Sequence, residues 1–163
     1  SFKHVRRLRD HLTDKPKVPW LYAAALAARR EFAVMQRLYP AVSIPRPVSC
    51  SRHALAMEYV AGPALNRVTL SDAREGLDLI LVEVARAFRL GLIHADLSEF
   101  NIIIAESGPV IIDWPQAVDA NHPHARELLE RDLVNVLRFF QRKYGIDLAL
   151  DEALHRVEGA DQV

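Results

Sequence analysis

The spacing of hydrophobic and polar residues predicts three helices in this chain. Residues 20–39, WLYAAALAARREFAVMQRLY, are rich in alanine and lack glycine and proline, which favours a helix. Residues 69–90 place apolar side chains along one helical stripe, and either Thr69 or Ser71 can serve as the N-cap. A last amphipathic helix is expected to begin at Pro123, because proline is favoured at the first helical position.

Shorter apolar runs predict strands. Residues 47–50 (PVSC) and 53–60 (HALAMEYV) are expected to be neighbouring strands joined by a turn. Residues 92–104, LIHADLSEFNIII, hold a histidine, two acids and an asparagine within an apolar run. Because buried polar groups need partners, this stretch is expected to be a strand, a functional loop and a second strand. Residues 108–113 (GPVIID) should complete a hairpin with that second strand.

Composition narrows the class of protein. The 163 residues fit one domain or most of one, and half of them are hydrophobic. Basic and acidic residues balance at 21 each, so the overall charge does not indicate a nucleic-acid-binding protein. Residues 1–17 carry a local basic excess, which is expected either to face phosphate or to be a solvated arm. The single cysteine, Cys50, excludes an internal disulfide and suits a reducing cytoplasm.

No targeting or membrane signal is expected from the sequence. No apolar run approaches the roughly 20 residues of a transmembrane helix. No signal peptide is recognisable. The chain begins with Ser1 rather than methionine, and its first residues resemble the middle of a domain, so we expect a fragment of a longer protein.

The polar residues of the 92–113 region have the spacing of a phosphoryl-transfer site. His94 and Asp96 are followed, after four residues, by Asn101, and Asp113 comes twelve residues later at the end of VIID. A carboxylate and an amide at the two ends of one loop can face one cleft, and the hairpin should bring Asp113 beside them. These hard oxygen ligands suit Mg²⁺, and kinases use this order of groups. His94 is expected to brace the loop rather than transfer protons.

Two further acids lie on apolar helix faces. Glu31 has no cation within reach on its own helix, so it is expected to meet a positive group from elsewhere or to reach solvent. Asp132 lies among Leu128, Leu129 and Val136. Since kinases use an aspartate on a carboxy-lobe helix to hold the catalytic-loop backbone, we predict that role for Asp132.

Two elements of ordinary kinases are missing from the sequence. None of the six glycines forms a glycine-rich loop, and no strand lysine precedes residues 20–39, so phosphate cradling is expected from sequence upstream of Ser1. Only about nine residues separate Asp113 from Pro123. That segment is too short for a regulated activation loop with a peptide-binding segment.

Several stretches in order resemble the RIO family of atypical serine/threonine protein kinases. They are SFKHVRRLRD, PWLYAAALAARREFAVMQRLYP, IPRPVSCSRHALAMEYVAG, LIHADLSEFNIII and VIIDWPQAV. The second of these is similar to the second RIO subfamily, shared by archaea and eukaryotes. The resemblance spans roughly Ser1 to Tyr144. The family often has glycine where Ala95 stands and phenylalanine where Trp114 stands; tryptophan should be tolerated there as a packing residue.

The resemblance implies an α+β, protein-kinase-like, two-lobed fold that lacks an activation loop. Residues 1–60 would be a remnant of the amino lobe, with a mobile arm at 1–19, the helix at 20–39 and a hinge strand at 53–60. Residues 61–163 would be the carboxy lobe, with the catalytic loop at 92–101. The phosphate loop, the strand lysine and a winged-helix domain would lie upstream, so this chain alone should turn over ATP poorly.

The resemblance also implies residue roles, cofactors and partners. Asp96 would be the catalytic aspartate, Asp113 would bind metal and could itself accept the phosphoryl group, and Asn101 would be the second metal ligand. The nucleotide-binding set would be Glu31, Met57, Glu58, Val60, Asn101 and Ile112, with main-chain contacts to adenine at Glu58 and Val60. The cofactors would be ATP with Mg²⁺ or Mn²⁺. The partners would be the small ribosomal subunit precursor and its RNA, in the cytoplasm and without a membrane.

Three alternatives remain open from the sequence. A small-molecule kinase of the aminoglycoside or choline type shares the H-x-D…N and IDW signals, although only one clear helix is predicted after Asp113. An inactive fragment that binds RNA or a partner would explain the basic residues in 1–17. A metal site built from Cys50 and histidines is the third, but no ligand spacing recurs.

Overall fold

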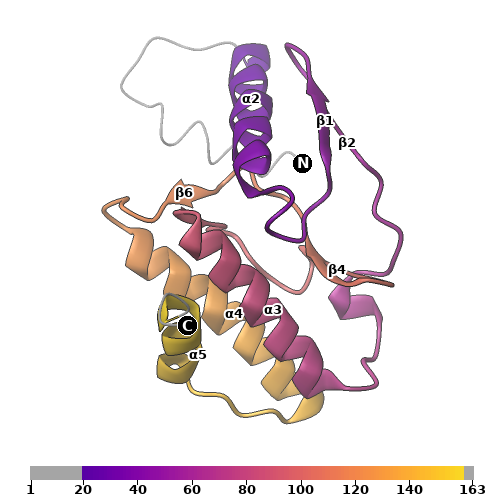
Figure 1. The fold of residues 1–163 in the computed structure, drawn as a ribbon, viewed down its shortest axis with the longest axis vertical. Coiled ribbons are helices and arrows are strands. Elements are labelled where there is room, and N and C mark those ends of the chain that lie inside the picture. Colours follow the sequence, from indigo (N-terminus) through magenta and orange to yellow (C-terminus); the bar gives the residue numbers. More distant parts are fainter. Residues whose placement is uncertain (1–19, 160–163) are drawn as a thin grey trace.

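The computed structural model describes residues 20–159, so the predicted arm at 1–19 lies outside the described part. Its first portion holds helix α2 (Trp20–Leu38) beside an antiparallel pair, β1 (Pro47–Cys50) and β2 (Leu55–Met57) (Figure 1). The helix predicted over 20–39 is confirmed. The strand predicted over 53–60 is shorter: it starts late because the N–H of Ser51 bonds to the carbonyl of Ala54 and closes the turn there, and it ends at Met57.

The second portion is mainly helical. Helices α3 (Ala73–Arg89) and α4 (Ala125–Tyr144) lie side by side, and α5 (Leu150–Glu158) packs against both (Figure 1). A short 3-10 turn, η1 (Leu65–Arg67), precedes α3. Helix α5 was not predicted; it follows Gly145, which ends α4 in the left-handed conformation at φ 64° as expected.

Two small antiparallel pairs frame the polar loop of the sequence. Strand β3 (Leu92–Ile93) pairs with β6 (Val118–Asp119), and β4 (Ile102–Ala105) pairs with β5 (Gly108–Ile111). The predicted hairpin is therefore confirmed, with Ile102 opposite Ile111. The register places the end of β5, and the Asp113 that follows, beside the end of the polar loop.

The helix starts differ from the predictions by a few residues. Asp72 caps α3 in place of Thr69 or Ser71, and its carboxylate accepts the N–H of Glu75 at 3.0 Å. Helix α4 begins at Ala125, two residues after Pro123. At α3 the side-chain hydrogen bond of Asp72 decides between closely spaced candidates, whereas the N-cap residue of α4, His124, makes no side-chain cap hydrogen bond.

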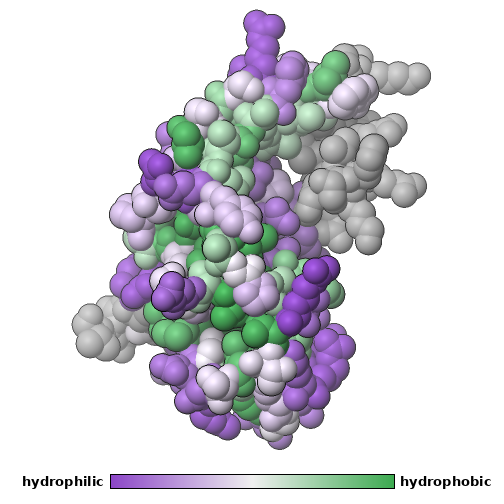
Figure 2. Space-filling view, turned by 90° about the vertical axis from the view of Figure 1, so that its right-hand side faces the viewer, coloured by the Kyte–Doolittle hydropathy of each residue, from purple (hydrophilic) through white to green (hydrophobic). Residues whose placement is uncertain are grey.

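One hydrophobic core joins the two portions. Met35 and Leu38 of α2 belong to the same buried cluster as Ile80 of α3 and Phe140 of α4. Several aromatic side chains stay at the surface, and Figure 2 shows hydrophobic residues interspersed with hydrophilic ones on the face that it draws. No helix within residues 20–159 is long and apolar enough to cross a membrane.

Candidate active site

The predicted functional loop runs from His94 to Asn101, between β3 and β4. The buried residues Leu92 and Ile93 lead into it, and Ile102 leaves it, so the core holds both ends. Ala95 turns the chain with φ of 67°, in the left-handed region that glycine occupies most readily. This conformation explains the glycine that the resemblance leads us to expect there.

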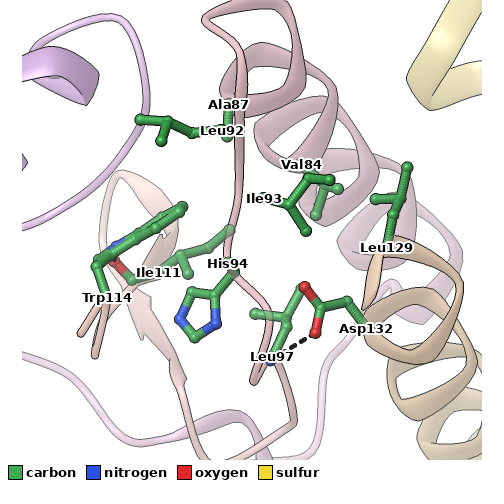
Figure 3. A pocket seen from close by; sticks show the side chains of 10 residues that line it. All are labelled: Val84, Ala87, Leu92, Ile93, His94, Leu97, Ile111, Trp114, Leu129 and Asp132. Carbon is green, nitrogen blue, oxygen red and sulfur yellow. Dashed lines mark hydrogen bonds between the residues drawn. The ribbon is translucent and has the colours of Figure 1, made fainter. Parts of the chain in front are cut away.

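Helix α4 holds the backbone of this loop. The carboxylate of Asp132 accepts the N–H of Ala95 at 2.8 Å and the N–H of Leu97 at 3.0 Å, the second of which is drawn in Figure 3. Arg131 donates to the carbonyl of Ala95 at 3.2 Å, and Asn135 donates to the carbonyl of Leu97 at 3.1 Å. The predicted contact of Asp132 with the loop is therefore confirmed.

The environment of Asp132 is nearly dry. Its side chain lies with a residue exposure of only 1%. Burial raises its pKa above the usual aspartate value, while the electrostatic interaction with His94 and the two backbone hydrogen bonds act in the opposite direction. A cavity of about 10 Å³ lies between Asp132, His94 and the apolar residues behind the loop (Figure 3). That volume is at the lower limit for one water molecule, so the region is packed support and not a nucleotide pocket.

His94 braces the loop, as predicted. Its Nδ1 lies 3.2 Å from the N–H of Asp96 and accepts that hydrogen bond, so Nε2 carries the proton and donates to the carbonyl of Ile112 at 2.9 Å. The ring also packs against Trp114, with 4.7 Å between ring centroids. His94 is buried and links the loop to the chain that precedes Asp113.

The structure brings the segments of Asp96, Asn101 and Asp113 together. The side-chain amide of Asn101 donates to the carbonyl of Asp96 at 2.6 Å, and the carbonyl of Asn101 accepts the N–H of Ile112 at 2.9 Å. Asp113 follows at once; it is exposed and has φ of 61°. Asn101 is thus bonded both to the backbone of Asp96 and to Ile112, the residue before Asp113.

The donor set of this site fits Mg²⁺. Because the amide nitrogen of Asn101 is engaged by the carbonyl of Asp96, its Oδ1 is the atom that can face a cation, and the exposed carboxylate of Asp113 is the second candidate ligand. Mg²⁺ is usually bound by one or two carboxylates together with substrate phosphates. No group of three or more His, Cys, Asp or Glu side chains within residues 20–159 is arranged to hold a metal alone, so the Cys50–histidine alternative gains no support.

Glu31 has a backbone partner within the described residues. Its Oε1 accepts the backbone N–H of Trp114 at 3.1 Å. Burial raises the pKa of Glu31, the nearby charge of Asp113 raises it further, and the Trp114 hydrogen bond acts against both. This bond engages one carboxylate oxygen, and a positive partner from the upstream part of the protein stays a prediction.

The predicted hinge segment connects the two portions next to the hairpin. Met57 and Glu58 are exposed and Val60 is half-buried. The N–H of Glu58 already bonds to the carbonyl of Arg46 at 2.9 Å, so its own carbonyl is the main-chain group left for a ligand. At Gly62, a Cβ would collide with the carbonyl oxygen of Ile104, which shows how closely the segment crosses β4. Ile112 lies at the far side of the same hairpin.

Sequence reasoning missed Arg131 and Asn135, the other two α4 side chains that hold the loop. Asn135 lies three residues after Asp132 and four after Arg131, so the two residues flank Asp132 along the helix. Neither position looked unusual, because charged and polar residues are common on exposed helix faces. Only the packing of α4 against the loop distinguishes them.

Comparison with known proteins agrees with this geometry. A family model described as the RIO domain matches residues 1–153. The chain is 46% identical over 153 residues to the RIO-type serine/threonine-protein kinase Rio2 of Methanocaldococcus jannaschii, covering 90% of this chain and 56% of that protein. It is 37% identical to the serine/threonine-protein kinase rio2 of Schizosaccharomyces pombe, covering 88% of this chain and 43% of that protein.

Solved structures show the same fold. The Rio2 kinase of Chaetomium thermophilum, in a complex described as ADP/Mg²⁺-phosphoaspartate, superposes with a TM-score of 0.76 at 27% identity, covering 92% of this chain and 53% of that one. The mixed α+β fold is therefore that of Rio2 kinases. The chain spans about half the length of the relatives it matches. Because the RIO domain match extends over nearly all of its residues, the chain belongs to the RIO family.

Proposed function

We propose that this chain is the catalytic part of a RIO-type serine/threonine kinase or ATPase that transfers the γ-phosphoryl group of ATP. The observation that carries the proposal is the loop from His94 to Asn101, which α4 holds by its backbone and which Asn101 ties to the residue before Asp113. The similarity to a Rio2 kinase solved with ADP and Mg²⁺ supports the choice of nucleotide and metal.

The geometry suggests a division of work among the residues. Asp96, at the start of the loop, would orient the acceptor hydroxyl and take its proton. Asn101 and Asp113 would bind Mg²⁺, which supplies positive charge to the phosphate oxygens. Glu58 and Val60 would contact adenine through the main chain, with Met57 and Ile112 against the ring. Glu31 would pair with a phosphate-binding lysine from the upstream part of the protein.

Asp113 has a second proposed role as the phosphoryl acceptor. A carboxylate oxygen of Asp113 would attack the γ-phosphorus, the bond to the β–γ bridging oxygen would break, and ADP would leave with that oxygen. Water would then attack the acyl phosphate and release inorganic phosphate, restoring the carboxylate. The phosphoaspartate named for the Chaetomium thermophilum complex and the exposure of Asp113 support this step. The protein would then work as an ATP-driven switch.

We place this activity in the maturation of the small ribosomal subunit, in the cytoplasm, on the basis of the RIO family membership. The subunit precursor and its RNA would be the partners. In the complete protein, residues 1–60 would belong to the amino lobe and residues 61–163 to the carboxy lobe of a two-lobed kinase.

The test uses γ-labelled ATP and Mg²⁺ with the full-length protein that contains this chain. Phosphate release and label transfer should fall by about 10²-fold or more in Asp96→Asn, as expected for loss of a general base. Asp147→Asn is the matched control, since this exposed aspartate lies in the remote α4–α5 connection and should behave as the unmutated protein. Equal activity in Asp96→Asn would contradict the proposal.

Other outcomes would favour the alternatives. Phosphorylation of an aminoglycoside or of choline would indicate a small-molecule kinase. Salt-dependent RNA binding without nucleotide affinity would indicate an inactive RNA-binding fragment.

A further inference from the structure

The residues that follow Asp113 form a tight turn. The N–H of Ala117 bonds to the carbonyl of Trp114 at 3.1 Å, and Pro115 occupies the second position, which suits its fixed φ. The N–H of Trp114 and the carbonyl of Ala117, at the two ends of the turn, take no part in that hydrogen bond. Trp114 itself is 1% exposed and its indole N–H donates to the carbonyl of Ile111 at 3.0 Å. The turn is thus anchored to the core that carries the catalytic loop.

Two consecutive residues of α2 bind these two groups. Glu31 accepts the N–H of Trp114 at 3.1 Å, and Arg30 donates through Nη2 to the carbonyl of Ala117 at 2.9 Å. The pair supplies a hydrogen-bond acceptor to one backbone group and a donor to the other, because one of these groups is an N–H and the other a carbonyl. The chain separation is 83 residues for one contact and 87 for the other, so the pair joins distant parts of the fold.

A third contact lies two helical turns further along α2. Arg37 donates to the carbonyl of Leu90 at 3.1 Å and to the carboxylate of Asp119 at 3.0 Å. Both side chains of this ion pair are about half exposed or more, so it is expected to add little by itself. The contacts at Trp114 and Ala117 therefore carry more of the attachment, because both residues are buried.

The turn Trp114–Ala117 lies next to the candidate metal-binding residue Asp113. It begins at the residue after Asp113, so whatever fixes the turn also limits the backbone of Asp113. Kinases need the helix glutamate and the metal-binding aspartate in place together, and an activation loop commonly controls this. Here the segment from Asp113 to α4 is too short for such a loop.

We propose that Arg30 is a positioning residue, which together with Glu31 clamps the turn Trp114–Ala117 and so fixes α2 and Asp113 in one arrangement without an activation loop. The inference rests on the proposed phosphoryl transfer for its functional consequence. Its structural content stands on the two hydrogen bonds alone. Pairing of Glu31 with a lysine would not explain the hydrogen bond of Arg30, because Arg30 donates to the carbonyl of Ala117.

The test compares Arg30→Gln, Arg30→Lys and Arg29→Gln in the full-length protein. Arg29→Gln is the matched control, because it removes the same charge from an exposed neighbour on α2. Amide hydrogen exchange at Trp114 and Ala117 should become about fivefold faster in Arg30→Gln, which corresponds to the loss of one hydrogen bond. Exchange should be closer to that of the unmutated protein in Arg30→Lys and unchanged in Arg29→Gln. Amides of α3 and α4 serve as the internal reference for intact folding.

Turnover is measured on the same variants. Arg30→Gln should lower kcat for ATP by about two- to fivefold and raise the Mg²⁺ concentration needed for half-maximal rate, since the competent arrangement is less populated. Unchanged exchange in Arg30→Gln, or the same change in Arg29→Gln, would overturn the clamp. Altered exchange with unchanged kcat would overturn the positioning role. If Asp96→Asn matches the unmutated protein, the proposed function fails instead, while the exchange result still decides the clamp.

Discussion

Replacing Asp132 tests whether a single buried carboxylate holds the loop that carries Asp96. In Asp132→Ala, the N–H groups of Ala95 and Leu97 lose acceptors at 2.8 and 3.0 Å in a region without room for a compensating water cluster. Each orphaned buried N–H costs about 1–3 kcal/mol, or roughly 2–6 kcal/mol for the two. Removing a buried charge offsets about 1–2 kcal/mol of this. We therefore expect the free energy of unfolding to fall by about 1–4 kcal/mol.

Asp132→Asn separates the acceptor role from the shape of the side chain. Asparagine keeps one oxygen for one N–H but turns an NH₂ donor toward the other, so a loss of about 1–3 kcal/mol is expected. The assay is urea unfolding at neutral pH, with the slope against urea checked for two-state behaviour. Asp147→Ala is the control and should stay within about 0.5 kcal/mol, because it removes an exposed carboxylate. A loss below about 1 kcal/mol in Asp132→Ala would refute the reasoning.

Two further predictions follow from backbone conformation and from burial. Since Ala95 is buried with φ of 67°, Ala95→Gly should change the free energy of unfolding by less than about 1 kcal/mol, whereas Ala95→Val should lower it by about 2–3 kcal/mol; urea unfolding of both variants decides, and equal stability would contradict this. Glu31→Gln keeps an oxygen for Trp114 but cannot ionise. Because the pKa of Glu31 is raised in the folded chain, its ionisation lowers the free energy of unfolding as pH rises above 4.5. The thermal unfolding midpoint of the variant should therefore equal that of the unmutated chain near pH 4 and exceed it near pH 7. If Glu31→Gln became less stable relative to the unmutated chain between about pH 4 and pH 7, the raised pKa would be contradicted.

Much of the site was predictable because its signals are local. The spacing of His94, Asp96, Asn101 and Asp113 sets the lengths of one loop and one hairpin, and both are confirmed. The contact of Asp132 was predictable because a carboxylate on an apolar helix face needs hydrogen-bond donors from another element. The roles of the site residues in binding and catalysis remain predictions.

Other features could not be predicted from local patterns. Helix α5 has only nine residues and its apolar side chains are recognisable only against α3 and α4. Strand β2 begins later than the apolar run that predicted it, because the turn from Ser51 to Ala54 takes up the first residues of that run. The N-cap of α3 depends on which of several neighbouring acceptors reaches a free N–H of the first turn, and Asp72 reaches that of Glu75.

The sequence by itself determined that a loop with the polar groups of a phosphoryl-transfer site lies between two buried strands, because strand period, loop length and side-chain type are local properties. Only the tertiary structure decided what holds that loop and the residue after Asp113. Asp132 reaches the loop across 35 and 37 residues of sequence, and Arg30 and Glu31 reach the turn across 87 and 83. The physical reason is that each contact joins a side chain to a backbone group on another element, and the packing of whole helices sets their distance.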